Sequence, residues 1–194
     1  MSEFAARGFD GAATRAIATR AGVAQAVVLY HFKTKDDLWK AAADRIQREL
    51  REQYQTRAAG LEGVDVRTRA RLLVGDYVRF AAKHPELHRF MLQEGTEPSE
   101  RLEWLVDTHV RPQVQMFREL VRDLEADGVT IRGRADHLWY MLIGAAATPY
   151  AVAPEFELVM DADPFSDDMV EAHVEAVLQL FFPDLSGDQP RRDL

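Results

Sequence analysis

The sequence predicts an all-α fold. Apolar residues recur at helical spacing in most segments, and glycines and prolines separate these segments from one another. No segment shows the sustained apolar–polar alternation of a half-buried strand. Residues 14–35 predict a helix, a glycine turn, a second short helix and the basic start of a third. Helix-turn-helix proteins use this order to place a recognition helix in the major groove of DNA.

After this motif, the spacing predicts six further helices. The first begins with Asp36 and Asp37, whose carboxylates favour the positive end of the helix dipole. Pro85 opens a short helix, and a bend is expected near Pro112 because proline lacks a backbone N–H. The six ranges are 35–58, 67–83, 85–93, 99–127, 135–147 and 168–181.

The last two of these ranges form the more apolar pair. Small residues at 144–147 allow another helix to approach closely, and a stripe at helical spacing runs along 170–181. Two such helices from each subunit predict a four-helix homodimer interface. The alternative is that both helices bury their apolar faces inside one subunit.

Composition indicates a globular protein with an ordinary core. Of the 194 residues, 47% are hydrophobic and 29% are charged, and the absence of cysteine excludes disulfides and thiolate metal sites. No apolar run reaches the roughly 20 residues of a membrane helix, and the start of the chain lacks signal-peptide features. We therefore expect a cytoplasmic protein without a membrane partner.

The distribution of charge bears on DNA binding more than the net charge of −8 does. Residues 1–45 hold seven Lys and Arg against five Asp and Glu, a net +2, so the remainder carries −10. A mildly basic N-terminal region on an acidic body can still bind phosphates locally. An excess of +2 over this length also arises by chance, so charge is weak evidence.

The helix-turn-helix assigns its residues to a small core and an outer face. Gly22 is expected in the left-handed conformation that ends the first helix. Small and branched side chains are expected in the core, among them Val23 and Val28. His31 is expected to cap or pack inside the three-helix unit rather than to contact DNA.

The outer face carries side chains suited to DNA. Arg15 has paired donors for guanine, and Gln25 can pair with adenine. Phosphate contacts position a protein without specifying sequence. The predicted DNA-facing set, in which Thr14, Tyr30 and Lys35 are placed for phosphates, is Thr14, Arg15, Gln25, Ala26, Tyr30 and Lys35.

Residues 4–38, FAARGFDGAATRAIATRAGVAQAVVLYHFKTKDDL, resemble the DNA-binding domain of the tetracycline-repressor (TetR) family of bacterial regulators. The resemblance covers about a fifth of the chain. It rests on ordered features: the Arg7-Gly8-Phe9 turn, Ile17-Ala18, Ala21-Gly22-Val23, and Tyr30-His31-Phe32 followed by Lys35 and Leu38. The resemblance implies that the predicted DNA-facing set contacts DNA.

The resemblance also implies the organisation of the whole chain. Residues 1–45 form the helix-turn-helix domain, and residues 46–185 form a helical domain that binds a small effector and dimerises through its last two helices. Residues 186–194 are expected to be a disordered tail.

Three departures from the family pattern bear on DNA binding. Leu29 stands where family members usually carry a tyrosine whose hydroxyl contacts phosphate, and Ala24 stands where a serine or threonine commonly caps the recognition helix. The family's first helix normally begins about ten residues before Phe4, so we expect the first helix of this sequence to be truncated.

An apolar effector is indicated by the aromatic and methionine content of the predicted C-terminal domain. Most of these side chains must form the core, but ligand pockets in helical domains are also apolar, with a few polar groups that orient the ligand. The candidate ligand residues are Tyr77, Phe80, Met91, Gln93, Trp104, His109, Gln113, Met116, Phe117 and Trp139.

Metal and enzyme chemistry find little support. His84 and His88 have metal-binding spacing, but no further ligand completes the set, and the acidic residues at 161–168 lack the glycine and glutamate of a calcium loop. We find no phosphate loop, nucleophile elbow or paired catalytic carboxylates. No cofactor is expected. The prediction is a homodimeric, ligand-responsive repressor of a palindromic operator. The alternatives are a ligand-binding dimer of the same fold with an impaired DNA-binding head, and an all-α enzyme.

Overall fold

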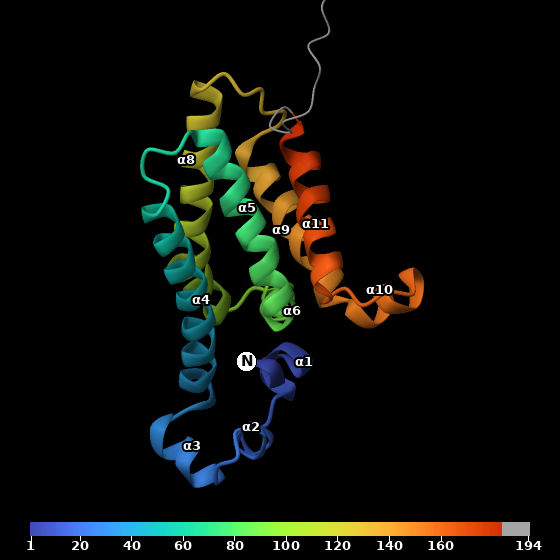
Figure 1. Cartoon of the computed structure of the whole chain (residues 1–194). Coiled ribbons are helices and arrows are strands. Elements are labelled where there is room, and N and C mark those ends of the chain that lie inside the picture. The colour runs from blue at the N-terminus through green and yellow to red at the C-terminus, as the bar shows by residue number, and fades with distance from the viewer. Residues whose placement is uncertain (184–194) are drawn as a thin grey trace, which may run out of the picture. The chain divides into compact units, whose positions relative to one another are not determined.

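The computed structural model describes residues 1–183, and the all-α prediction is confirmed, because this part consists of helices and loops without a strand (Figure 1). The tail predicted at 186–194 lies outside the described residues. The described chain forms two compact units. The head unit comprises residues 1–53 and 84–111, and the body unit comprises 54–83 and everything from 112 onward. Each unit therefore combines separate stretches of sequence.

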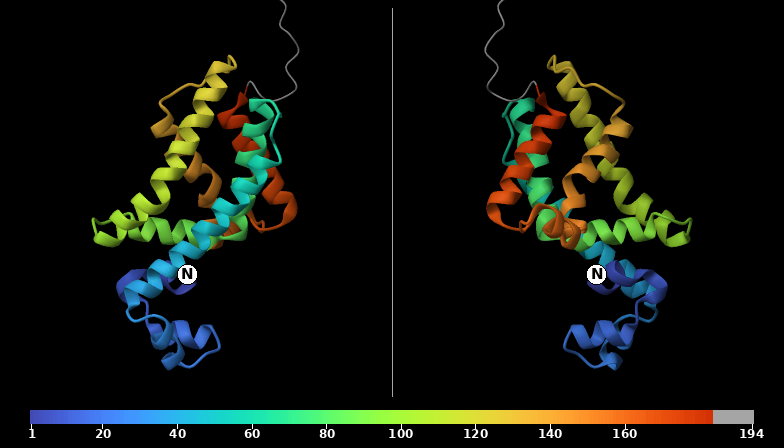
Figure 2. Two further views of the ribbon diagram at one scale, coloured as in Figure 1. Left: turned by 90° about the vertical axis from the view of Figure 1, so that its left-hand side faces the viewer. Right: turned by 90° about the vertical axis from the view of Figure 1, so that its right-hand side faces the viewer.

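The head unit begins with three short helices, α1 (Ser2–Gly11), α2 (Thr14–Arg20) and α3 (Gln25–His31). The long helix α4 (Lys35–Ala59) follows, and its residues up to Gln53 belong to this unit. Three later elements complete it: α6 (Pro85–Glu94), α7 (Glu100–Leu105) and the π-helical turn η1 (Val106–Val110). In both views of Figure 2, the blue helices α1 to α3 gather near the start of α4.

The head core joins both stretches of its sequence. Trp39 of α4 is buried, with its ring centroid 5.0 Å from that of Phe90 in α6. Helix α1 contributes Phe4, and Leu105 of α7 packs into the same cluster. The core of the helix-turn-helix thus depends on residues that follow it by more than 50 positions in the sequence. The predicted domain boundary at residue 45 did not include the second stretch, residues 84–111, in this unit.

The body unit contains the end of α4 and five further helices: α5 (Val66–Lys83), α8 (Arg111–Ala126), α9 (Ala135–Ala151), α10 (Ala153–Met160) and α11 (Asp167–Phe181). Helices α5, α9 and α11 lie side by side in Figure 1. A Cβ on Gly75 would lie 3.3 Å from Val174, so the absence of a side chain lets α5 approach α11. Arg79 then binds both carboxylate oxygens of Glu171 at 2.6 Å.

A π-helical turn, η1, directly precedes the position near Pro112 where a bend was predicted. The backbone N–H of Arg111 reaches back five residues to the carbonyl of Val106, just before the proline whose nitrogen carries no hydrogen. The single predicted helix at 99–127 is therefore the continuous series α7, η1 and α8.

Helix α10 is an addition to the predicted elements. Residues 153–160 follow the helix break after α9, and Pro154 occupies the first turn, where a missing N–H costs nothing. The predicted last two helices, 135–147 and 168–181, correspond to α9 and α11. No helix was predicted between residues 147 and 168, so the sequence pattern missed α10.

Pro149 inside α9 leaves one backbone carbonyl of that helix without its helical hydrogen bond, and a side chain of α11 supplies the donor instead. Proline cannot donate to the carbonyl four residues earlier, which is that of Ala145. The Nε2 atom of His173 lies 2.9 Å from this carbonyl oxygen and donates a hydrogen bond to it. The ring of His173 also stands edge-on to Tyr150 at 5.7 Å. This contact joins two of the body helices through a backbone group that would otherwise lose its partner.

Candidate nucleic-acid interface and ligand cavity

The turn between α2 and α3 confirms the expected role of Gly22. Its φ of 69° is left-handed, and the N–H of Val23 bonds to the carbonyl of Ala18 while the N–H of Gly22 bonds to that of Thr19. These paired bonds form the Schellman ending that sets the angle at which α3 leaves α2. Ala18 and Val28 are buried beneath the turn.

Two expectations for the small core were wrong. The side chain of Val23 is 41% exposed, because it lies in the turn itself rather than beneath it. His31 is also exposed, since it is the last residue of α3 and its ring stands edge-on to that of Tyr30 at 5.3 Å. His31 therefore lies on the exposed surface of the head unit.

The predicted DNA-facing side chains lie on α2, α3 and the first residue of α4. Gln25 donates from Nε2 to the hydroxyl of Thr14 at 3.2 Å, which joins the first residues of α2 and α3. One amide hydrogen and the amide oxygen of Gln25 remain for a base edge. Arg15 and Ala26 are exposed, and Tyr30 is 85% exposed. Their contact with DNA stays a prediction.

The recognition helix carries both expected departures. Ala24 is the N-cap of α3 and makes no side-chain hydrogen bond to its first turn. Leu29 is 51% exposed, so an apolar side chain without a donor lies on the outer face of α3. Both features remove a polar contact from the element that is predicted to bind DNA.

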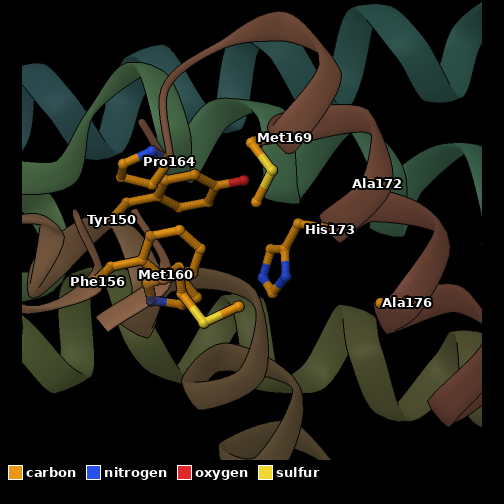
Figure 3. A pocket seen from close by; sticks show the side chains of 9 residues that line it. Tyr150, Phe156, Met160, Pro164, Met169, Ala172, His173 and Ala176 are labelled. Atoms are coloured by element: carbon orange, nitrogen blue, oxygen red, sulfur yellow. The ribbon is translucent and has the colours of Figure 1, made fainter. Parts of the chain in front are cut away.

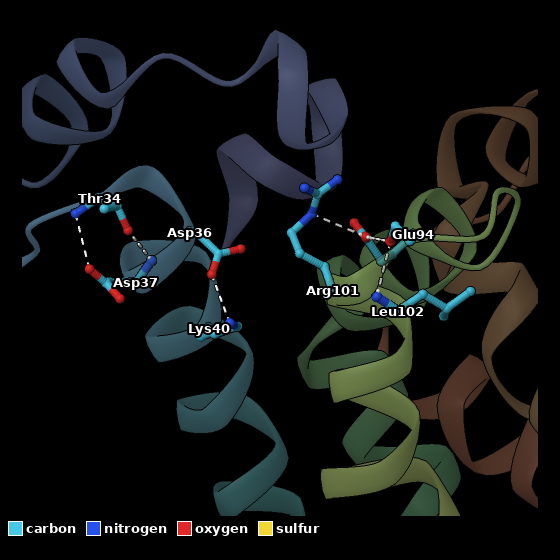
Figure 4. Close-up of polar contacts among 8 residues, drawn as sticks. Thr34, Asp36, Asp37, Lys40, Glu94, Arg101 and Leu102 are labelled. Atoms are coloured by element: carbon cyan, nitrogen blue, oxygen red, sulfur yellow. Dashed lines mark hydrogen bonds and ion pairs between the residues drawn. The ribbon is translucent and has the colours of Figure 1, made fainter.

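The start of α4 is firmly fixed by contrast. Thr34 and Asp37 form a capping box, in which the backbone N–H of each donates to the other's side chain at 3.0 Å (Figure 4). Asp36 pairs with Lys40 at 2.8 Å. Lys35 is half-buried here, with Nζ 3.1 Å from the carbonyl oxygen of Asp10.

The ten predicted ligand residues are divided between the two units. Met91 and Trp104 pack against the head core, and Gln93 is exposed near Gly8 in the same unit. In the body unit, Phe117 and Trp139 have ring centroids 5.6 Å apart. The remaining body residues are partly or fully buried, Tyr77 and Phe80 on α5 and Gln113 and Met116 on α8. Their role as ligand contacts stays a prediction.

His109 has a specific structural environment in the head unit. It lies on η1, its side chain is 2% exposed, and Nε2 is 2.8 Å from a carboxylate oxygen of Asp44 on α4. Trp104 packs edge-on against the imidazole at 5.4 Å. Burial lowers the pKa of His109, and the Asp44 contact opposes this shift. The π-helical turn thus places a buried imidazole against α4.

A cavity of about 250 Å³ lies in the body unit between α9, α10 and α11 (Figure 3). Its wall is almost wholly apolar, and none of the ten predicted ligand residues lines it. Burial raises the pKa of Tyr150, which lines the cavity, to about 12. The lining residues are Pro149, Tyr150, Phe156, Met160, Pro164, Met169, Ala172, His173 and Ala176. Sequence spacing could not reveal this cavity, because α10 was not predicted.

No helix among the described residues is long and apolar enough to cross a membrane. No three of their histidine and carboxylate side chains gather closely enough to hold a metal ion.

Comparison with known proteins matches the start of the chain to a family of bacterial regulators. Residues 1–42 match the family model described as bacterial regulatory proteins, tetR family. The chain is also similar to the probable HTH-type transcriptional regulator YttP of Bacillus subtilis (strain 168). The two are 23% identical over 147 residues, which are 76% of this chain and 71% of YttP.

Solved structures share the fold over nearly the whole chain. The transcriptional regulator FadR from Bacillus subtilis, in complex with stearoyl-CoA, has a TM-score of 0.64 at 15% identity, with 96% of this chain and 94% of FadR covered. AibR, in complex with isovaleryl coenzyme A and operator DNA, has a TM-score of 0.67 at 14% identity, with 93% and 92% covered.

The head unit thus defines a helix-turn-helix protein of the class that regulates transcription. Within that class, residues 1–42 match the DNA-binding domain of the tetR family, and the described chain shares the fold of solved TetR/AcrR-family regulators.

Proposed function

We propose that this chain is a homodimeric repressor that binds a palindromic operator and is released by a small apolar effector. The observation that carries the proposal is the outer face of the helix-turn-helix. The hydroxyl of Thr14 orients Gln25 through a hydrogen bond. Arg15 and Tyr30 are exposed on the same two helices, and Lys35 is the first residue of α4. Base-reading and phosphate-binding side chains on one face are what sequence-specific binding requires.

The homodimer is supported by apolar side chains that the body unit leaves in water. Tyr140 and Met141 of α9 are 74% and 59% exposed, and Leu180 of α11 is 68% exposed. Contiguous exposed apolar surface usually marks an interaction site. Helices α9 and α11 are the pair that was predicted to form a four-helix interface between two subunits. A two-fold dimer would present two recognition helices to operator half-sites about 34 Å apart.

An effector with an apolar acyl part is supported by two solved structures of similar fold, which contain isovaleryl coenzyme A and stearoyl-CoA. The ten predicted ligand residues and the apolar cavity between α9, α10 and α11 offer separate places for such a ligand. We place the protein in the cytoplasm and assign it no catalytic step. Effector binding would lower DNA affinity through its preference for a conformation that binds DNA poorly.

The test is binding of the purified protein to labelled duplex DNA from the region upstream of its own coding sequence, with a shuffled duplex as competitor. Arg15→Ala and Gln25→Ala should reduce discrimination between the duplexes, because base contacts specify sequence. Lys35→Ala should weaken binding to both duplexes alike. Isovaleryl-CoA and stearoyl-CoA, added to the complex, test for release.

A protein that dimerises and binds acyl-CoA but discriminates between no duplexes would favour the ligand-binding alternative. The exposed Leu29 and the uncapped α3 are the observations that favour this second function. Conversion of a bound ligand into product would favour an enzyme.

A further inference from the structure

The ring of Phe9 contacts two cations in the head unit. The guanidinium carbon of Arg101 lies 3.7 Å from the ring centroid, and Nζ of Lys35 lies 4.8 Å from it. Phe9 directly follows Gly8, whose φ of 66° kinks α1, and its ring stacks on that of Phe4. The face of an aromatic ring attracts positive charge at these distances. Phe9 therefore connects the start of α4 with α7.

Arg101 is held in place from its other side. Its Nε donates to Oε1 of Glu94 at 3.2 Å, and the same oxygen accepts the hydroxyl of Ser99 at 2.9 Å (Figure 4). The Glu94 side chain is only 8% exposed, so its charge needs a cationic partner. Ser99 also caps α7 by accepting the N–H of Leu102. The position of the guanidinium is therefore tied to the first turn of α7.

The ammonium group of Lys35 already contacts two residues of α1, Asp10 and Phe9. It donates to the carbonyl of Asp10 and lies over the ring of Phe9. An ammonium has three donors, so capacity remains for a DNA phosphate. A side chain already held in one position loses less freedom on binding.

We propose that Arg101 is a positioning residue for DNA binding, which acts through the Phe9 ring on Lys35. The inference rests on the proposed DNA-binding function and adds a residue outside the helix-turn-helix to it. Arg101 holds the Phe9 ring, the ring and the Asp10 carbonyl hold the ammonium, and the ammonium contacts the DNA backbone. The strength of the phosphate contact thus depends on α7, and a change at the first turn of α7 changes DNA affinity without touching the recognition helix.

The experiment measures duplex affinity across a series of salt concentrations for the full chain, Arg101→Met, Lys35→Ala and the double variant. The probe is the labelled upstream duplex, with the shuffled duplex beside it. Arg101→Met should weaken binding to both duplexes about fivefold. It should also lower the slope of log affinity against log salt by about one, as the loss of a single phosphate contact does. If Arg101 acts through Lys35, the double variant should bind no more weakly than Lys35→Ala.

The matched control is Arg111→Met, which removes one positive charge from the same unit. Arg111 is 73% exposed and pairs only with Asp107, one helical turn away on the described chain. It should leave the salt slope unchanged. Arg101→Lys keeps a cation that can reach the ring and should restore most of the slope.

Additive losses in the double variant, or an unchanged slope for Arg101→Met, would overturn the inference while leaving the proposed function intact. If Arg101→Met does not fold, Phe9→Leu replaces it, because leucine keeps the apolar contact with Phe4 and removes the ring face. An unchanged slope for a folded Phe9→Leu overturns the inference equally. If the parent protein shows no salt-sensitive binding to either duplex, the proposed function and the inference both fail.

Discussion

Ala24 begins the recognition helix without a side-chain oxygen to satisfy its first backbone N–H groups. A threonine at this position has the reach to accept one of them, and such caps contribute about 1 kcal/mol. The missing cap concerns the helix on which base recognition depends. It is also easily restored, because Ala24 is exposed and has the extended backbone of an N-cap.

Ala24→Thr should raise the free energy of unfolding by about 0.5 to 1 kcal/mol and should tighten binding to the upstream duplex. Chemical denaturation and duplex titration measure the two effects. The matched control is Ala24→Val, which has the shape of threonine without its hydroxyl. An equal gain for valine would show that the effect comes from side-chain shape and not from capping.

His109 makes stability depend on pH in a defined direction. Burial lowers its pKa in the folded protein, so protonation favours the unfolded chain. The stability that the neutral imidazole contributes is present above the unfolded pKa of about 6.5 and is lost as the pH falls below it. His88, whose pKa burial also lowers, acts in the same direction.

His109→Gln should flatten the fall in unfolding free energy between about pH 7 and pH 5, because glutamine does not titrate and can still donate to Asp44. His88→Gln should remove a separate part of the slope. A slope that persists in full without His109 and His88 would assign the dependence to other groups.

Helices α9 and α11 are joined by a hydrogen bond from His173 to the carbonyl of Ala145, and a double-mutant cycle can test its contribution. The helical partner of this carbonyl is absent because residue 149 is proline. His173→Phe should cost about 1 kcal/mol in unfolding free energy, because it removes the hydrogen bond to a partly buried acceptor.

In a Pro149→Ala background, the restored N–H can bond to the same carbonyl, so His173→Phe should cost clearly less. Thermal and chemical unfolding of the four proteins give the coupling directly. Equal costs in both backgrounds would mean that the histidine stabilises the pair of helices through its packing on Tyr150 alone.

The existence and extents of the long helices could be predicted from sequence, because their apolar spacing and terminal signals are local. The left-handed Gly22 and the uncapped Ala24 were predictable for the same reason. Helix α10 is short and exposes much of its apolar surface, Leu158 at 88% for example, so its pattern did not distinguish it from a loop. The cavity beside it and the Arg101–Phe9–Lys35 group depend on contacts between distant segments, which periodicity does not report.

At the scale of the whole molecule, the exposed apolar residues of the body unit give a test of self-association. Met141→Glu places a charge on the surface proposed to join two copies, and in a two-fold dimer the change occurs twice. Loss of methionine burial at both sites should raise the dimer dissociation constant by at least about 100-fold. Sedimentation equilibrium over a range of protein concentrations measures it.

Leu92→Glu is the control, because Leu92 is 56% exposed on α6 of the head unit and lies outside the proposed dimer surface. It should leave the dissociation constant unchanged. A dimer that tolerates Met141→Glu as well as Leu92→Glu would place the association surface elsewhere.

The discontinuous head unit has a consequence for how the protein is made. A ribosome releases residues 1–53 first, but Trp39 and Phe4 lack Phe90 and Leu105 until the segment up to 111 has also emerged. The helix-turn-helix therefore completes its core only after α5, which belongs to the other unit, has been synthesised. A nascent chain that stalls before residue 84 would expose apolar surface to chaperones and proteases. Premature termination in that interval should yield degradation products rather than a free DNA-binding fragment.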